Sequence, residues 1–186
     1  MTALGALWLS VLLSSVFVFL LSSIVHMLPL WHQNDYPLYP GQDRVLDALR
    51  PLAIPRGDYL FPRPSSRAEM KSPEFIEKTK QGPVVIMTVI PHGPLGMGRA
   101  LALWFVYIVV VNFCAAYIAS RALAPGAPYL AVFRFAGTTA FFAYSLALWQ
   151  MSIWYGRAWS TTIKATVDGL IYGCVVAGTF GWLWPR

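Results

Sequence analysis

The chain has 186 residues, of which 57% are hydrophobic and only 12% are charged. Soluble domains usually carry about 25% charged residues, so this composition excludes an ordinary soluble domain and predicts a membrane protein. The net charge is +6, but the segment between Trp31 and Gly98 holds eight of the fourteen basic residues and seven of the eight acidic ones. Because that segment is close to neutral, the basic excess does not indicate nucleic acid as a partner. The predicted partner is the lipid bilayer.

The first apolar run extends from Leu4 to Leu28. It is long enough to cross a hydrocarbon core, which takes about 20 residues of helix. It has no basic segment before it and no clear cleavage site after it, and it exceeds the roughly 7–15 residues of a signal-peptide core. We therefore expect residues 1–30 to form a retained transmembrane helix that ends at Pro29.

Residues 31–98 are predicted to form a small extramembrane α+β cap. Its strongest signals are a helix start at Ser72-Pro73-Glu74 and a β-branched, almost wholly apolar run from Pro83 to Ile90. A strand that is apolar on both faces needs cover on both, so we expect helices on one side and the membrane surface or a second copy on the other. The elements expected in the cap are helices at 43–50 and 72–81 and strands at 59–61 and 83–90.

Residues 99–186 are predicted to hold three more transmembrane helices, at 99–120, 129–155 and 161–184. The fold class is therefore an all-α membrane protein, a four-transmembrane-helix bundle with the cap between helices 1 and 2. Both termini should lie on the same side of the membrane. No internal repeat is detected, which argues against an inverted-repeat transporter within one chain.

The last transmembrane helix carries a small residue at every fourth position. This spacing places these residues along one ridge of a helix, where they allow a neighbouring backbone to approach closely. The ridge predicts that the last helix is the packing spine of the bundle; its residues are Gly169, Gly173, Ala177 and Gly181.

Several polar residues should lie at similar depth at the end of the bundle that leads into the cap. Asp168 and Lys164 are one turn apart in the last helix, Arg99 begins the second helix and Gln150 lies near the end of the third. Ionisable residues in membrane helices are costly and are functional candidates. Two interpretations stay open: Asp168 forms an ion pair that locks the bundle, or it contacts a substrate, proton or ligand.

The chain contains three histidines, and these are its candidate nitrogen ligands for a metal or haem iron. His26, His32 and His92 together with Asp35 would supply a mixed nitrogen and oxygen set. The alternative is that each histidine hydrogen-bonds to a nearby backbone carbonyl, and on balance no cofactor is predicted. The two cysteines, Cys114 and Cys174, lie in apolar runs and predict no metal motif or disulfide framework.

A glycine-rich segment directly precedes the second transmembrane helix. Gly93, Gly96 and Gly98 are followed by Arg99, and exposed amides at a helix start next to an arginine suit an anion such as a lipid phosphate. The pattern is neither a Walker loop nor a dinucleotide fingerprint. The alternative interpretation is a flexible connection between the strand and the helix.

No hydrolase, metalloprotease or Cys–His pattern is present, so the sequence does not favour an enzyme. The first hypothesis is a structural or accessory subunit that self-associates or joins a larger membrane complex. The alternative is a small-ligand or ion handler for lipid, metal or proton, which uses the polar layer at the cap end of the bundle. A membrane-embedded enzyme is the third possibility.

The chain also resembles a family of small bacterial inner-membrane proteins with four predicted transmembrane helices, known only as uncharacterised membrane proteins. The resemblance covers nearly the whole chain and implies a bacterial inner membrane, without implying an activity. The excess of basic residues on the cap side favours a cytoplasmic cap. The stretches that carry the resemblance are His26-Met27, His32, Asp35-Tyr36, Glu77-Lys78, Gly82-Pro83, Met87 to Val89, Asp168 to Tyr172 and Gly178 to Pro185.

Overall fold

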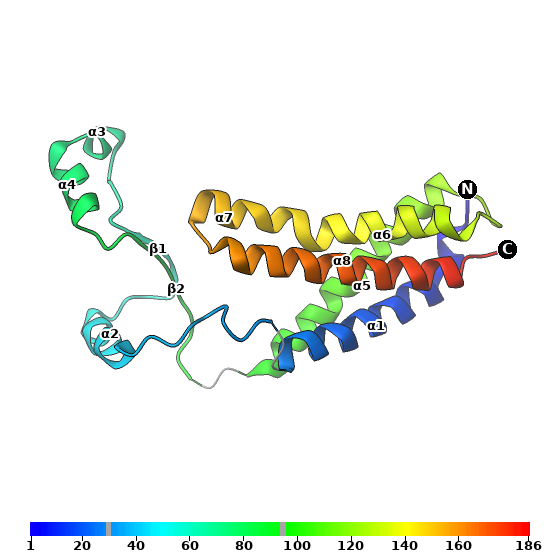
Figure 1. Ribbon diagram of the computed structural model, residues 1–186, viewed down its shortest axis with the longest axis horizontal. Coiled ribbons are helices and arrows are strands. Elements are labelled where there is room, and N and C mark those ends of the chain that lie inside the picture. The colour runs from blue at the N-terminus through cyan, green and yellow to red at the C-terminus, as the bar shows by residue number, and fades with distance from the viewer. Residues whose placement is uncertain (29–30, 94–95) are drawn as a thin grey trace. The chain divides into compact units, whose positions relative to one another are not determined.

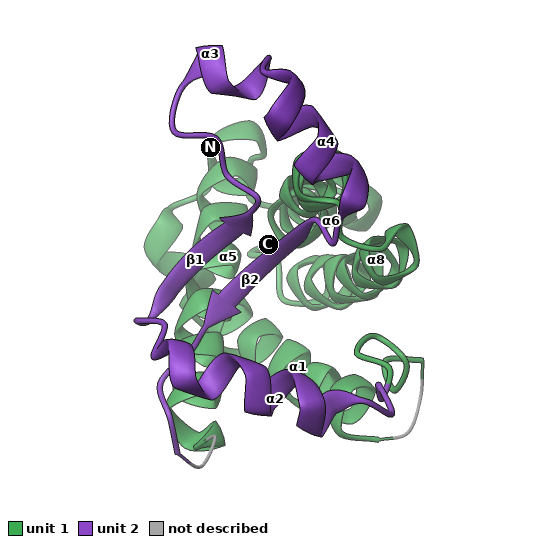
Figure 2. Cartoon of the chain, turned by 90° about the vertical axis from the view of Figure 1, so that its left-hand side faces the viewer, with its two compact units in different colours: residues 1–37, 96–186 green, residues 38–95 purple. Residues whose placement is uncertain are grey.

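The computed structural model describes residues 1–28, 31–93 and 96–186. These residues form two compact units (Figure 2). Unit 1 comprises Met1–Pro37 and Gly96–Arg186, and unit 2 comprises Leu38–Leu95. Pro29, where we expected the first helix to end, and part of the glycine-rich segment at 91–98 lie outside the described residues.

Unit 1 is a helical bundle (Figure 1). Among the described residues, four helical segments are long and apolar enough to cross a membrane, which confirms the predicted fold class. The third segment differs from the expected continuous helix, because a short 3-10 turn interrupts it after Ser145. The elements are η1 (Leu4–Leu7), α1 (Trp8–Met27), α5 (Met97–Ala122), α6 (Tyr129–Ser145), η3 (Leu146–Leu148), α7 (Trp149–Tyr155) and α8 (Trp159–Trp182).

The four long helices form a closed ring of neighbours, α1 with α5, α5 with α6, α6 with α8, and α8 with α1. Both chain ends lie at the same end of this bundle, as predicted (Figure 1). The backbone N–H of Thr2 donates to the carbonyls of Ser120 and Leu123, and the N–H of Gly126 donates to the carbonyl of Pro185. The two termini thus hold the connection between α5 and α6.

The ridge of small residues on α8 packs against α6, which confirms its predicted role as the packing spine. A Cβ added to Gly173 would lie 3.0 Å from the carbonyl oxygen of Gly137, and one added to Gly137 would lie 2.6 Å from the Cβ of Ala177. Such distances leave no room for larger side chains, so the two backbones approach closely. The other ridge positions are covered by α6 as well, Gly169 by Ser145 and Gly181 by Tyr129.

Polar side chains join α1 to α5. The Asn112 amide donates to Ser15 Oγ at 3.0 Å, and the Trp104 indole donates to Ser22 Oγ at 2.8 Å. Other serines of α1 bond back to their own helix, as Ser14 does to the carbonyl of Ser10 at 2.6 Å. Hydroxyls that bond within the helix satisfy their donors without water, and this explains how a serine-rich segment is compatible with a membrane helix.

Unit 2 contains a two-stranded antiparallel sheet and short helices. Strand β1 (Gly57–Phe61) pairs with β2 (Val85–Val89) in a register that places Tyr59 opposite Met87. Ser72 caps α4 by accepting from the N–H of Phe75, as its sequence signal predicts. No described residue of unit 2 is buried. The helical elements are α2 (Gln42–Leu49), η2 (Arg50–Leu52), α3 (Arg67–Met70) and α4 (Pro73–Gln81).

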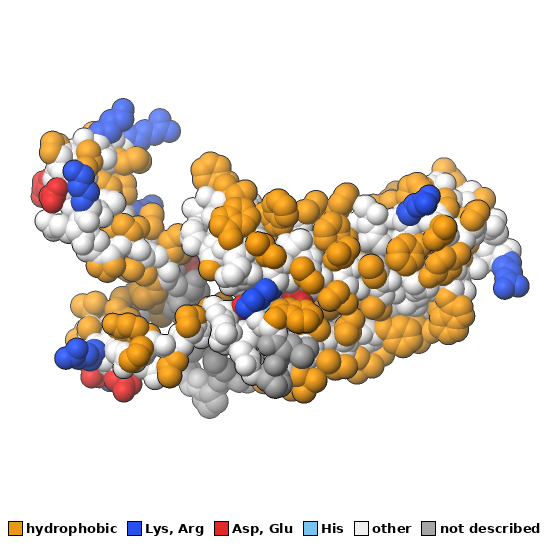
Figure 3. Space-filling view, in the orientation of Figure 1, with side chains coloured by type: hydrophobic (Ala, Val, Ile, Leu, Met, Phe, Trp, Pro, Cys, Tyr) orange, Lys and Arg blue, Asp and Glu red, His pale blue; other side chains and the backbone are white. Residues whose placement is uncertain are grey.

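The outer surface of the bundle is apolar. Figure 3 shows hydrophobic side chains over much of the visible face of unit 1. Large exposed residues occur along every long helix, including Leu20 in α1, Phe113 in α5, Phe142 in α6 and Leu170 in α8. A soluble monomer rarely exposes so continuous an apolar surface, and this surface therefore fits acyl chains.

Candidate functional site

The candidate site is a group of polar side chains at the cap end of the bundle, the end at which α1 ends and α5 begins. We call these residues the polar cluster: His26, Trp31, His32, Asp35, Lys164 and Asp168. They come from the last turn of α1, the turn that follows it, and the first three turns of α8. All of them belong to unit 1.

Asp168 is the most deeply buried member of the polar cluster. Only 3% of the surface of Asp168 is exposed. Trp31 Nε1 donates to its Oδ1 at 3.1 Å, and His32 Nε2 lies 2.8 Å from its Oδ2. Both carboxylate oxygens therefore have partners, and both partners come from the segment directly after α1.

His32 bridges two carboxylates. Its Nε2 faces Asp168, and its Nδ1 lies 2.7 Å from Oδ2 of Asp35. A neutral imidazole has one N–H, whereas an imidazolium donates from both nitrogens, so a protonated His32 would donate to both carboxylates at once. A backbone hydrogen bond from the N–H of Asp35 to the carbonyl of His32 closes the turn and fixes this arrangement.

Asp35 is held in turn by Lys164, whose Nζ donates to its Oδ1 at 2.8 Å. Burial by itself raises the pKa of Asp35, but the hydrogen bonds from His32 and Lys164 outweigh burial, so its pKa lies below the usual value. Lys164 and Asp168, one turn apart in α8, therefore do not pair with each other. Lys164 bonds to Asp35, and Asp168 bonds to His32.

Each carboxylate of the polar cluster has a basic partner. Lys164 and His32 both contact Asp35, and His32 also contacts Asp168. Pairing and hydrogen bonding are what make charges tolerable away from water. The arrangement is therefore compatible with a position among membrane helices.

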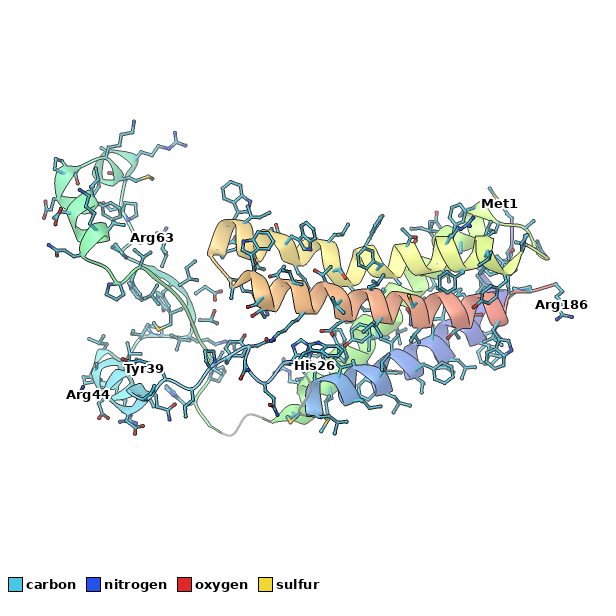
Figure 4. All side chains as sticks on the ribbon, in the orientation of Figure 1. Met1, His26, Tyr39, Arg44, Arg63 and Arg186 are labelled. Carbon is cyan, nitrogen blue, oxygen red and sulfur yellow. The ribbon has the colours of Figure 1, made fainter. Side chains whose placement is uncertain are left out.

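His26 completes the polar cluster on the α1 side (Figure 4). Its Nδ1 lies 3.0 Å from the carbonyl oxygen of Ser22, and its ring stacks on that of His32 with centroids 4.4 Å apart and planes 11° from parallel. A carbonyl only accepts, so Nδ1 carries a proton, and in a neutral imidazole Nε2 then has the free lone pair. His26 itself is exposed.

A groove of about 380 Å³ reaches His26 from the gap between α1 and α5. Ser22, His26 and Met27 form one wall, and Met97 and Trp104 belong to the other. The groove is mostly apolar, with the imidazole as its ionisable group. A molecule with an apolar part and a polar end could therefore approach the polar cluster from this side.

Two buried tyrosines adjoin the polar cluster. Tyr172 lies one helical turn beyond Asp168, and its ring contacts that of Tyr144 with centroids 5.6 Å apart. Among the described residues, both hydroxyls are buried without a hydrogen-bond partner. A buried hydroxyl usually has a partner, so these two groups are exceptions in the interior of the bundle.

The structure brings only part of the predicted polar layer together. Arg99, in the first turn of α5, and Gln150, in α7, are both exposed, and neither joins the hydrogen bonds of the polar cluster in the described part of the chain. His92 and Gly93 belong to unit 2, whereas Gly96 and Gly98 belong to unit 1. A Cβ at Gly93, Gly96 or Gly98 would meet nothing within 4 Å, so no close packing requires glycine there.

Three residues near the site were not among those proposed from the sequence: Trp31, Tyr144 and Tyr172. Tyr172 had a signal, because its i, i+4 spacing from Asp168 places both on one helix face. Trp31 and Tyr144 had none, since their positions depend on how the turn after α1 and helix α6 pack on α8.

No family model, curated protein or solved structure matches the chain.

Proposed function

We propose that this integral membrane protein binds a small ligand or ion at the polar cluster. The observation that carries the proposal is the convergence of two carboxylates, two imidazoles and an ammonium group from three segments at one end of an apolar bundle. Ionisable groups at such positions commonly mark the paths or sites of ions and ligands in membrane proteins.

A purely structural lock explains the polar cluster less well. Buried ion networks add little net stability compared with apolar packing of the same volume, because desolvation offsets their attraction. One ion pair would already fix the turn after α1 on α8. Such a lock does not require the groove beside His26 or buried hydroxyls without a partner among the described residues, as at Tyr144 and Tyr172.

Native mass spectrometry of the detergent-purified protein tests the proposal. We expect the wild-type chain to carry a bound lipid, ion or small molecule that is lost in His26→Ala and in Asp168→Asn. The matched control is Asp47→Asn, which changes a carboxylate whose side chain is 68% exposed. A wild-type spectrum without any bound species, with variants that differ only in stability, would overturn the proposal in favour of a lock.

A second candidate function is that of an accessory subunit that self-associates or joins a larger membrane complex. The observation in its favour is the absence of any buried residue in the described part of unit 2, although β2 and its flanks carry large apolar side chains. Val84, Val85, Ile86 and Ile90 are each between 39% and 57% exposed. A sheet surface of this kind is stabilised by cover from another protein surface.

Cross-linking tests this candidate. A cysteine at the exposed position of Val84 should cross-link to a second copy or to a co-purified membrane protein, whereas a cysteine at the exposed, polar Gln81 should do so less. Equal cross-linking at both positions would count against an interface on β2.

We further propose that the protein resides in a bacterial inner membrane with its cap in the cytoplasm. The resemblance to small bacterial inner-membrane proteins supports the membrane, and the distribution of Lys and Arg supports the orientation, because it places eleven basic residues on the cap side and three on the other. The C-terminus would then lie outside the cytoplasm. A reporter that is active only outside the cytoplasm should therefore be active when fused after Arg186, and a reporter that is active only in the cytoplasm should not. Activity of a cytoplasmic reporter at that position would reverse the orientation.

A further inference from the structure

We infer that the polar cluster is a binding site for one divalent transition-metal ion, held by His26, His32 and Asp168. The inference rests on the proposed function, because it names the ligand of the same site. Each of the three residues offers one ligand atom, and these atoms all lie within 4.8 Å of one another.

The ligand atoms are nearly close enough to share an ion. Zinc binds imidazole nitrogen and carboxylate oxygen at about 2.0–2.2 Å, so donors around one tetrahedral ion lie about 3.4 Å apart. Donors that are up to 4.8 Å apart would therefore have to approach by about 1.4 Å. Nε2 of His32 and Oδ2 of Asp168, which lie 2.8 Å apart, would have to separate slightly to admit the ion. Stacked rings direct their lone pairs in parallel rather than toward a common point, so one ring has to tilt. His26 has room to tilt, because it is exposed in the last turn of α1.

Each histidine is already hydrogen-bonded in the way that metal-binding histidines are. A histidine ligand usually donates its other N–H to a carbonyl or a carboxylate, which fixes the ring and makes the ligating nitrogen more basic. Nδ1 of His26 donates to the carbonyl of Ser22, and Nδ1 of His32 donates to Asp35. In both residues Nε2 is therefore the nitrogen that would face an ion, and in His32 the ion would replace the present hydrogen bond to Asp168.

Asp168 and Asp35 have distinct roles in this arrangement. Trp31 occupies Oδ1 of Asp168, which leaves Oδ2 as the single oxygen offered to the ion. Lys164 holds Asp35 in place against His32, and among the described residues it forms no hydrogen bond with Asp168. The ion would take the position of the proton that His32 Nε2 now shares with Asp168 Oδ2.

The donor set indicates which metals fit. Two imidazoles and one carboxylate suit Zn²⁺, Co²⁺ or Fe²⁺, whereas Mg²⁺ and Ca²⁺ prefer a shell made of oxygens. Three protein ligands also leave a coordination position for water or for a bound molecule, unlike the four-ligand shell of a purely structural zinc site. The groove beside His26 gives access to that side of the polar cluster.

Cobalt titration tests the inference on the full-length, tag-free protein in detergent, after treatment with a chelator. We expect one Co²⁺ per chain with visible absorption bands typical of low-coordinate nitrogen and oxygen ligation, and displacement of Co²⁺ by Zn²⁺. His26→Ala is the decisive variant, because it removes a ligand and leaves the hydrogen bonds among His32, Asp35, Lys164 and Asp168 in place. It should weaken Co²⁺ binding at least 10-fold, a loss on the scale of changes around metal ligands.

The matched control is His92→Ala, which removes the one histidine outside the polar cluster and should leave Co²⁺ affinity unchanged. Asp35→Asn should weaken Co²⁺ binding by about 10–100-fold, because Asp35 orients His32. Absence of saturable Co²⁺ binding, an unchanged affinity in His26→Ala, or an equal loss in His92→Ala would overturn the inference. If native mass spectrometry then finds a lipid or another non-metal species that depends on Asp168, the proposed function stands and only the metal assignment fails.

Discussion

Replacing Gly173 with leucine tests the contact between α8 and α6 on which the bundle depends. The Cβ of any side chain at this position would lie 3.0 Å from the carbonyl oxygen of Gly137, 3.2 Å from the Cβ of Phe141 and 3.3 Å from its backbone nitrogen. Two of these three atoms belong to the backbone of α6, and rotating a side chain does not move them. The helices therefore have to separate.

The expected cost follows from the size of the added group. Inserting extra methylenes into a well-packed core costs about 1–3 kcal/mol and occasionally more. Leucine adds three carbons beyond a Cβ that is already too close, so we expect a loss of about 3 kcal/mol. Replacing glycine in a helix recovers at most about 1 kcal/mol of intrinsic propensity, which leaves a net loss of about 2 kcal/mol. For a chain of this size, that corresponds to a melting temperature lower by about 4–8 °C.

Thermal unfolding of the detergent-solubilised protein, followed by tryptophan fluorescence or circular dichroism, measures this loss. Gly178→Leu is the matched control in the same helix, because a Cβ there would meet only the hydroxyl of Tyr129, at 3.7 Å. We expect the control to stay within about 1 kcal/mol of the wild type, as substitutions away from close packing usually do. A melting temperature of Gly173→Leu equal to that of the control would refute the close packing of α8 on α6.

Three further predictions concern hydrogen bonds and ion pairs between the segments of unit 1. Asp168→Asn should lower the free energy of unfolding by about 3 kcal/mol, because it removes the buried carboxylate charge that pairs with His32 and accepts from Trp31, whereas Asp47→Asn at an exposed ion pair should cost less than about 1 kcal/mol; thermal unfolding compares the two. Trp31→Phe keeps an aromatic ring but removes the hydrogen bond to Asp168, and chemical denaturation should show a loss of about 1.5–3 kcal/mol. Ser15→Ala deprives the Asn112 amide of its acceptor, and adding Asn112→Leu to it should recover part of the stability, since a pair of apolar groups leaves no unsatisfied donor. A double variant less stable than Ser15→Ala alone would contradict the last prediction.

The small-residue ridge of α8 packs within its own chain, and this limits which surfaces can mediate self-association. Gly169, Gly173 and Ala177 are buried, and the ridge as a whole packs against α6. The ridge is therefore not a free surface for a second copy, although its spacing resembles that of helix-dimerisation motifs. If the protein forms an oligomer, other surfaces, such as the apolar strand β2, have to provide the interface.

The fold was largely readable from the sequence. Long apolar runs have one stable arrangement in a bilayer, because every backbone N–H and C=O must be paired within the segment. For the same reason the four spans could be located from composition alone. Small residues at every fourth position indicated which face of α8 would pack against another helix. In the cap, Ser72-Pro73 indicated the start of α4 and the β-branched run around Val85 indicated β2. The interruption of the third span after Ser145 had no comparable signal.

The site was readable only in part. The sequence identified Asp168, His26, His32 and Asp35 as residues of interest, because ionisable groups near membrane helices are costly and few. It did not determine their pairing: Lys164 lies four residues from Asp168 in α8, yet its ammonium bonds to Asp35. That choice depends on the path of the turn after α1, which carries His32 and Trp31 onto α8. Periodicity and composition describe each segment separately, whereas contacts between side chains more than 130 residues apart are decided by tertiary packing.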